Sequence, residues 1–250
     1  MKLYFMYNGR IVLPQDHYLG IRKGAGYSIP VIMALLVHPV HGPIVLDTGG
    51  NFKRMEPFAR RDYNTDIAFR VDRYLARLGY NTGDIEHVCI SHMHLDHGGN
   101  IDFFPNAKIH IRESEWESAL ALASGGYMPK DVEVYRNFGF DFDFIHDGVD
   151  YDVFGDGSLV CIDTHGHTAG HQSFITNLAN TGKVVIAMDC TQLEEDIYGV
   201  DFLQNENADP DGCLSAAKKM RSFKETGAFI VCGHDPDQWT TMRHFPEYYD

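Results

Sequence analysis

The chain has 250 residues, of which 44% are hydrophobic and 22% are charged. It can bury a sizeable core, so disordered, collagen-like and coiled-coil architectures are excluded. Asp and Glu number 35 against 21 Lys and Arg, a formal charge of −14, which argues against nucleic acid as a partner. Five scattered cysteines without C-x-x-C spacing, and an N-terminus without a secretory signal, predict a cytoplasmic protein.

The first half of the chain is predicted to begin with two strands, at 2–6 and 10–13. Residues 24–46 lack Asp, Glu, Lys and Arg over a length that could span a bilayer. Prolines and glycines interrupt this stretch, so we expect strand 31–37 to form a hairpin with 43–47 and no association with a membrane. Apolar residues at helical spacing predict a helix over 66–78, which Gly79 ends.

The second half alternates short apolar runs with helical patterns, and no linker or repeat divides it. The elements expected are strands 87–90 and 108–111, helix 114–123, strands 159–162 and 184–188, helix 209–224, and strand 228–232. Four of these strands run into loops rich in His and Asp. Side chains at the ends of strands on a rigid sheet are a common way to build a functional site.

The densest of these loops contains three histidines and one aspartate within six residues, in the order His92-Met93-His94-Leu95-Asp96-His97. Imidazole and carboxylate groups bind zinc and similar divalent ions at neutral pH. Such a loop can direct His92 and His94 to one position and Asp96 and His97 to a neighbouring one. The spacing therefore predicts a metal centre with two sites. A solvated polar loop is the alternative, but it would not explain the buried strand before the motif or the glycines after it.

Further histidines and aspartates follow the later strands, in Gly166-His167, Ala187-Met188-Asp189 and Gly233-His234. Together with the first loop and with Val45-Leu46-Asp47-Thr48-Gly49, this ordered set resembles the metallo-β-lactamase superfamily. The resemblance extends from residue 45 to residue 234. It implies an α/β fold in which two sheets and outer helices form a four-layer αββα sandwich, as one domain over residues 1–250.

The resemblance also implies the role of each site residue. His92, His94 and His167 would hold one metal ion, and Asp96, His97 and His234 would hold a second. Asp189 would bridge the two ions, and Asp47 and His171 would orient ligands from behind. The ions would be two divalent metals, with zinc expected, although manganese, iron and cobalt suit the same ligands. His165 and the histidines outside these motifs are interpreted as structural or solvated, namely His17, His38, His41, His87, His110, His146 and His244.

Within the superfamily, the chain is most similar to the N-acyl homoserine lactonases, the enzymes of quorum quenching. The stretches that carry this similarity are Lys2–Phe5, Arg77–Tyr80, Arg112–Glu117, Gly170–Ser173 and Phe245–Tyr248. The similarity implies opening of a lactone ring by metal-activated hydroxide on a small-molecule substrate. Thioester, lactam or amide, and phosphodiester hydrolysis are the alternatives, and a metal-binding protein without activity is the non-enzymatic one. The oligomeric state is not predicted.

The chain departs from the lactonase pattern next to the expected reaction centre. Those enzymes carry a Tyr three residues after the bridging Asp, and this chain has Gln192 there. An amide can donate a hydrogen bond but cannot supply a phenolic proton, so we assign Asp189 and Gln192 as catalytic, with Tyr198 as a possible replacement for the Tyr. Leu95 also replaces an aromatic residue. Candidate walls of an apolar pocket are Tyr18, Tyr27, Met33, Leu35, Leu95, Phe103 and Phe104, for each of which a plain core role is the simpler interpretation.

Overall fold

Two mixed β-sheets lie face to face in a computed structural model that describes residues 1–12, 18–19, 22–23, 28–198 and 209–250. The first sheet has the strand order β6-β1-β4-β5-β7-β8-β9 and the second β10-β11-β12-β13-β14. The strands of the first sheet are β1 (Lys2–Val12), β4 (Ser28–His38), β5 (Gly42–Leu46), β6 (Tyr63–Asn64), β7 (His87–Cys89), β8 (Lys108–Arg112) and β9 (Asp141–Ile145). Those of the second are β10 (Tyr151–Asp152), β11 (Leu159–Asp163), β12 (Gln172–Leu178), β13 (Gly182–Met188) and β14 (Phe229–Cys232). The short strands β2 (Tyr18–Leu19) and β3 (Arg22–Lys23) pair apart from both.

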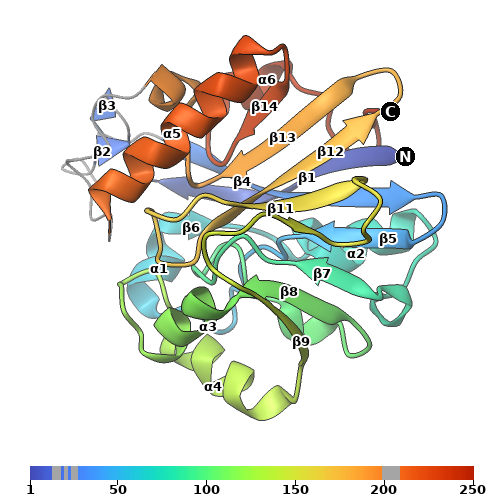
Figure 1. Cartoon of the computed structure of the whole chain (residues 1–250). Coiled ribbons are helices and arrows are strands. Elements are labelled where there is room, and N and C mark those ends of the chain that lie inside the picture. Colours follow the sequence, from blue (N-terminus) through green and yellow to red (C-terminus); the bar gives the residue numbers. More distant parts are fainter. Residues whose placement is uncertain (13–17, 20–21, 24–27, 199–208) are drawn as a thin grey trace.

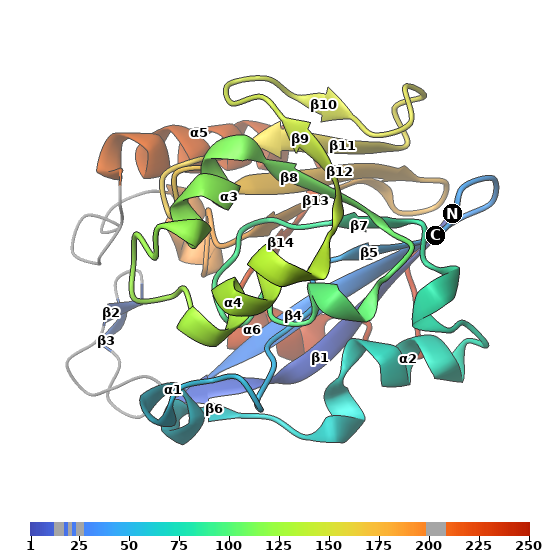
Figure 2. The same ribbon diagram turned by 90° about the horizontal axis from the view of Figure 1, so that it is seen from below.

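Helices cover the outer face of each sheet (Figures 1 and 2). The helices are α1 (Pro57–Asp62), α2 (Val71–Arg77), α3 (Glu113–Leu120), α4 (Pro129–Phe138), α5 (Pro210–Glu225) and α6 (Pro236–Thr241). Short 3-10 turns occur at Ile67–Phe69, Thr82–Asp84, Ile101–Phe103 and Glu194–Tyr198. Helices α2, α3 and α4 pack on the first sheet and α5 on the second. No helix of the described residues is long and apolar enough to cross a membrane.

Three apolar layers account for this arrangement. One lies between the sheets, where residues such as Phe5, Leu36 and Phe174 are completely or almost completely buried. A second lies beneath α2, α3 and α4, and a third beneath α5. Alternate residues of a strand face opposite sides of a sheet, so the strands supply both the inner layer and an outer one. The four-layer αββα sandwich expected from the sequence is confirmed.

The predicted elements are present, but the helix expected over 114–123 ends at Leu120, and two further elements differ in extent. The expected strands 2–6 and 10–13 are one strand, β1, whose register to β4 shifts between Tyr7 and Gly9. The helix expected over 66–78 is interrupted at Arg70, which has an extended backbone and separates a 3-10 turn from α2. The guanidinium of Arg70 donates to the carboxylate of Asp72 at 2.7–2.9 Å, and this local polar contact accompanies the break. The predicted hairpin is confirmed, with Val37 opposite Pro43.

The order of strands brings the polar loops to one edge of the sandwich. Strands β5, β7, β8 and β9 are parallel, as are β13 and β14, so their carboxyl ends share a direction. Asp47 after β5 and Met188 at the end of β13 have positive φ values of 56° and 51°. These left-handed residues turn the chain sharply at the strand ends, and the loops that follow converge above the inter-sheet core.

Candidate metal centre

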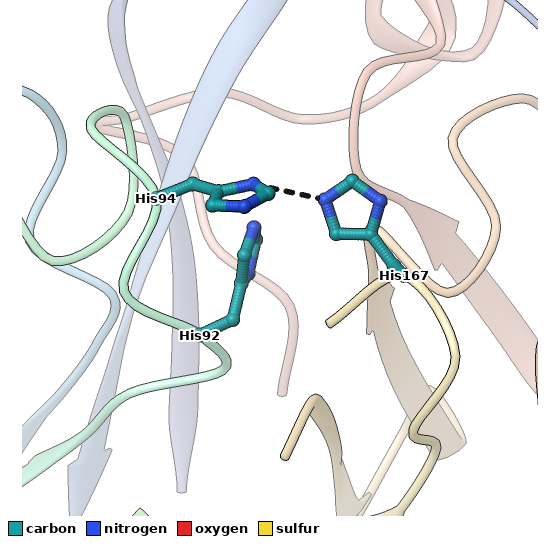
Figure 3. Close-up of side chains that lie close together, drawn as sticks. All are labelled: His92, His94 and His167. Atoms are coloured by element: carbon teal, nitrogen blue, oxygen red, sulfur yellow. Dashed lines mark hydrogen bonds between the residues drawn. The ribbon is translucent and has the colours of Figure 1, made fainter. Parts of the chain in front are cut away.

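The loop after β7 and the loop between β11 and β12 bring three histidines together (Figure 3). His92, His94 and His167 each offer a ring nitrogen within 4.8 Å of the others. Nδ1 of His94 lies 3.1 Å from Nε2 of His167. Figure 3 shows the three rings turned toward one another from two separate segments of the chain. They could hold one metal ion.

A second group lies directly beside the first and includes Asp96, His97, His234 and Asp189. Nε2 of His97 is 3.2 Å from Oδ1 of Asp189, and Nε2 of His234 is 3.1 Å from its Oδ2. Asp96 approaches both histidines at 3.5 Å. Asp189 also lies 3.5 Å from Nε2 of His167 in the first group, so its carboxylate is between the two groups.

The donor set fits two tetrahedral divalent ions. At Zn–N and Zn–O distances of about 2.0–2.2 Å, neighbouring ligand atoms of a tetrahedral ion lie about 3.3–3.6 Å apart. Most of the separations given above fall within a few tenths of an ångström of that range. In addition, Nε2 of His92, Nε2 of His97 and Oδ1 of Asp189 are buried and make no hydrogen bond to any described residue. Buried polar atoms normally have partners, and a cation would supply one for all three.

The charges of these groups also favour a cation. Burial keeps the pKa of His92, His94 and His167 below the ordinary value, so their rings are neutral. Burial would raise the pKa of Asp189, but His234 and His97 outweigh this effect and hold it well below the usual range. The carboxylates of Asp189 and Asp96 in turn raise the pKa of His97 against its burial. Neutral imidazoles and ionised carboxylates are the forms that bind metals, and binding would displace the proton of His97.

Asp47 and His171 lie behind these groups. Nδ1 of His97 donates to Oδ2 of Asp47 at 2.7 Å, which leaves Nε2 facing the centre. Asp47 also accepts from the backbone N–H of Ser91 at 2.7 Å. Nε2 of His171 accepts from the backbone N–H of Asp189 at 3.2 Å, and its Nδ1 contacts the hydroxyl of Thr164 at 2.9 Å. His171 therefore uses both nitrogens to hold the chain on either side of the centre.

Gln192 and Tyr198 differ clearly in position. Nε2 of Gln192 lies 3.4 Å from Oδ2 of Asp189, and its side chain is half-buried beside the centre. The ring of Tyr198 is 56% exposed and faces Arg221 and Lys224 of α5. The geometry thus places Gln192, and not Tyr198, next to the carboxylate of Asp189.

Sequence reasoning missed the residues that surround His94. Nε2 of His94 contacts the hydroxyl of Ser124 at 3.0 Å, and its ring packs edge-on against Tyr127 with centroids 4.9 Å apart. A Cβ on Gly126 would overlap the imidazole, so only glycine fits there. In the sequence, Gly125 and Gly126 merely follow the helix expected over 114–123. The contact of Gly126 with His94 could not be predicted, because it depends on the tertiary fold.

The other histidines lie apart from this centre. His165 is exposed and pairs with Asp163 at 2.7 Å. Nδ1 of His38 accepts backbone N–H groups at 3.0–3.1 Å in the turn between β4 and β5. His87 contacts His110 at 3.0 Å, and His110 contacts Asp143 at 2.9 Å. These contacts agree with the structural roles expected, while His17 lies outside the described residues.

The candidate pocket walls are mostly core residues. Met33, Leu35 and Phe104 are buried under the helices of the first sheet, and Phe103 packs against the same layer. Leu95 packs in a small separate cluster with residues that include Met55, Tyr63 and Met128. Tyr27 and the side chain of Tyr18 lie outside the described residues.

The chain is similar in sequence and in fold to known proteins. Residues 31–234 match the metallo-beta-lactamase superfamily. The N-acyl homoserine lactonase AttM of Azorhizobium caulinodans is 33% identical over 273 aligned positions, which cover 100% of this chain and 99% of the relative. A quorum-quenching N-acyl homoserine lactone lactonase of known structure has a TM-score of 0.83 and 28% identity, covering 99% of this chain and 97% of that one. An N-acyl homoserine lactone hydrolase with N-hexanoyl-L-homoserine bound at its catalytic metal centre has a TM-score of 0.82 and 28% identity, covering 99% and 98%.

Proposed function

Because this chain belongs to the metallo-beta-lactamase superfamily, and within it to the N-acyl homoserine lactonases, we propose that it hydrolyses the ring of N-acyl homoserine lactones. The observation that carries the proposal is the carboxylate of Asp189, which lies within 3.5 Å of histidines from both ligand groups. A carboxylate in that position can serve two metal ions and a reacting group between them.

We assign the ligands as the sequence predicted. His92, His94 and His167 would hold the first ion, Asp96, His97 and His234 would hold the second, and Asp189 would contribute to both. Five imidazoles and two carboxylates suit zinc, which is the metal we expect, and manganese, iron and cobalt accept the same set. When bound, such ions supply a nucleophile from water at neutral pH and polarise the lactone carbonyl.

The side chains around the ions provide orientation and proton transfer. Asp189 is ionised and can pass a proton from the attacking water to the oxygen that leaves the ring. The amide of Gln192 can donate to the oxygen on which negative charge develops. Asp47 fixes the tautomer of His97, and His171 fixes the backbone at Asp189, so both keep ligands in place.

Other hydrolytic reactions on the same centre are the alternatives. Thioesters and lactams present a carbonyl to the same groups, whereas phosphodiesters of nucleic acids are disfavoured by the net charge of −14. The five cysteines are buried and unpaired, which supports the expected cytoplasmic location. We propose a small-molecule substrate and no nucleic-acid or membrane partner.

Acid release from N-hexanoyl homoserine lactone tests the proposal. The zinc-loaded protein is expected to release one proton per ring opened at neutral pH, and the product is expected to close again on acidification. A chelator should abolish the release and added zinc should restore it. Full zinc occupancy without acid release from this lactone would contradict the proposed substrate, and the same assay with thioesters and lactams would identify the alternative.

The variant Asp189→Asn separates the roles of this residue. An amide cannot carry the proton, so turnover is expected to fall by about 10²–10⁴-fold. Measuring the zinc content of the variant distinguishes loss of the proton carrier from loss of a ligand. Unchanged turnover with both ions bound would remove the proton-transfer role.

A further inference from the structure

A buried carboxylate in the first turn of α3 joins the two loops that carry the first ligand group. Glu115 is fully buried. Its Oε1 accepts from the backbone N–H of Met93 at 2.8 Å and from the hydroxyl of Tyr127 at 3.0 Å. Its Oε2 accepts from the backbone N–H of Gly170 at 3.3 Å.

Two of these hydrogen-bond partners, Met93 and Gly170, lie in the loops that carry the proposed ligands. Met93 stands between His92 and His94 in the first loop. Gly170 stands between His167 and His171 in the second. A single side chain therefore connects the backbone between His92 and His94 with the backbone three residues after His167.

The contact between Glu115 and the second loop is closely packed as well as hydrogen-bonded. A Cβ on Gly170 would overlap the backbone and side chain of Glu115, so the second loop lies directly on the start of α3. The ring of Tyr127, whose hydroxyl donates to Glu115, packs against His94. Glu115 thus reaches His94 by two routes, through Met93 and through Tyr127.

The charge of Glu115 has no cationic partner among the described residues, since the groups that donate hydrogen bonds to it are backbone N–H groups and a tyrosine hydroxyl. Burial raises the pKa of this carboxyl above its usual value, because the ionised form loses its water. A buried charge of this kind is costly unless something compensates it. The adjacent positions proposed for two divalent ions offer the missing positive charge.

We propose that Glu115 is a positioning residue for the first metal ion: it locks the two ligand loops together and supplies negative charge behind His92, His94 and His167. This inference rests on the proposed metal centre. It predicts that the first ion binds tightly only while the Glu115 carboxylate is present.

The variant Glu115→Gln tests this inference because it keeps the shape of the side chain. Its oxygen can still accept from Met93, but its NH₂ group would face the N–H of Gly170, and the charge is lost. Substitution of such outer partners typically weakens metal affinity by about 10–100-fold. We expect zinc titration against a chromophoric chelator to show one ion weakened by that factor, with the other retained. The visible spectrum of the cobalt-loaded variant should change correspondingly.

Two further variants keep the test decisive. Tyr127→Phe removes only one donor and is expected to weaken the same ion by a smaller factor, which covers the case in which Glu115→Gln does not fold. Leu36→Ala lowers stability in the core between the sheets, away from the loops, and should leave both affinities unchanged. Wild-type affinities and cobalt spectra in both Glu115→Gln and Tyr127→Phe would overturn the role of Glu115 alone. A wild-type protein that binds no zinc would overturn the proposed metal centre together with it.

Discussion

Nδ1 of His97 donates a hydrogen bond of 2.7 Å to Asp47, a residue that follows a different strand of the same sheet. Both side chains are fully buried. The contact fixes the proton of His97 on the nitrogen away from the centre, so Nε2 presents its lone pair to the proposed second ion. Carboxylate–histidine pairs of this kind tune both the orientation and the basicity of a ligand.

Replacing Asp47 by Asn is expected to weaken the second zinc ion by about 10–100-fold. The amide keeps the size of the side chain but loses the charge that holds the His97 proton. Chelator competition measures the affinity, and His165→Ala is a suitable control because His165 is exposed and pairs only with residues outside the centre. Equal affinity in Asp47→Asn and wild type would contradict this role.

The two adjacent glycines before Tyr127 provide a matched pair of variants. Gly126→Ala would push a methyl group into the ring of His94, whereas a Cβ on Gly125 meets nothing within 4 Å. We expect Gly126→Ala to lose the first ion, with a fall in activity of at least about tenfold. Gly125→Ala should behave as wild type. Similar zinc content in the two variants would show that the segment can move aside.

Gln192→Ala is expected to lower kcat/KM without changing the zinc content. If the amide donates to the developing oxyanion, its loss should cost about 10²–10³-fold in rate. Tyr198→Phe is the control, because the Tyr198 ring is exposed and faces α5, and its activity should be unchanged. The reverse pattern in these two variants would assign the role to Tyr198.

Stability should depend on pH through His110, which lies away from the centre. Burial lowers its pKa to about 4, against the opposing effect of Asp143, whereas the unfolded value is 6.5. The neutral ring is therefore favoured by folding: its full contribution is present above pH 6.5 and is lost as the pH falls toward 4. The difference corresponds to at most about 3 kcal/mol.

Urea denaturation of the wild type and of His110→Gln between pH 7.5 and pH 5 measures this contribution. The free energy of unfolding of the wild type should fall more steeply with decreasing pH than that of the variant. Both proteins are compared at equal zinc content, because the ligand histidines also titrate. Parallel pH profiles would mean that His110 is not buried in its neutral form.

The cluster of His and Asp in the first loop was predictable because its spacing is local and it follows an apolar strand, whereas the assignment of His167, Asp189 and His234 as ligands came from the resemblance to a known superfamily and remains a prediction. A loop such as His92–His97 contains its own signal, and the carboxyl ends of parallel strands meet at one edge. The supporting role of Glu115 was not predictable in the same way. Glu115 contacts Met93 and Gly170, which lie 22 and 55 positions away in the chain, and no pattern within a short window records such a contact.

Two of the elements that were not predicted, β9 and α4, have similar physical reasons. Strand β9, DFDFI, lies at the edge of its sheet, where its residues are only partly buried and the apolar pattern is correspondingly mixed. Helix α4 begins at Pro129 and ends at Phe138, and Gly139 after it has the left-handed conformation. Its polar composition hides the two positions that pack in the core, Val132 and Tyr135. Short helices gain most of their stability from such tertiary packing.

The proposed ligands come from both sheets, since His92 to His97 follow β7 of the first and His167, Asp189 and His234 follow β11, β13 and β14 of the second. Neither sheet holds a complete set for either ion. Metal ions bound by these residues would link the two sheets at the edge of the sandwich. Only the fully assembled fold could bind them tightly. Their binding free energy would then add directly to the free energy of unfolding. Limiting the zinc supply would therefore lower the activity and also shorten the lifetime of the folded protein.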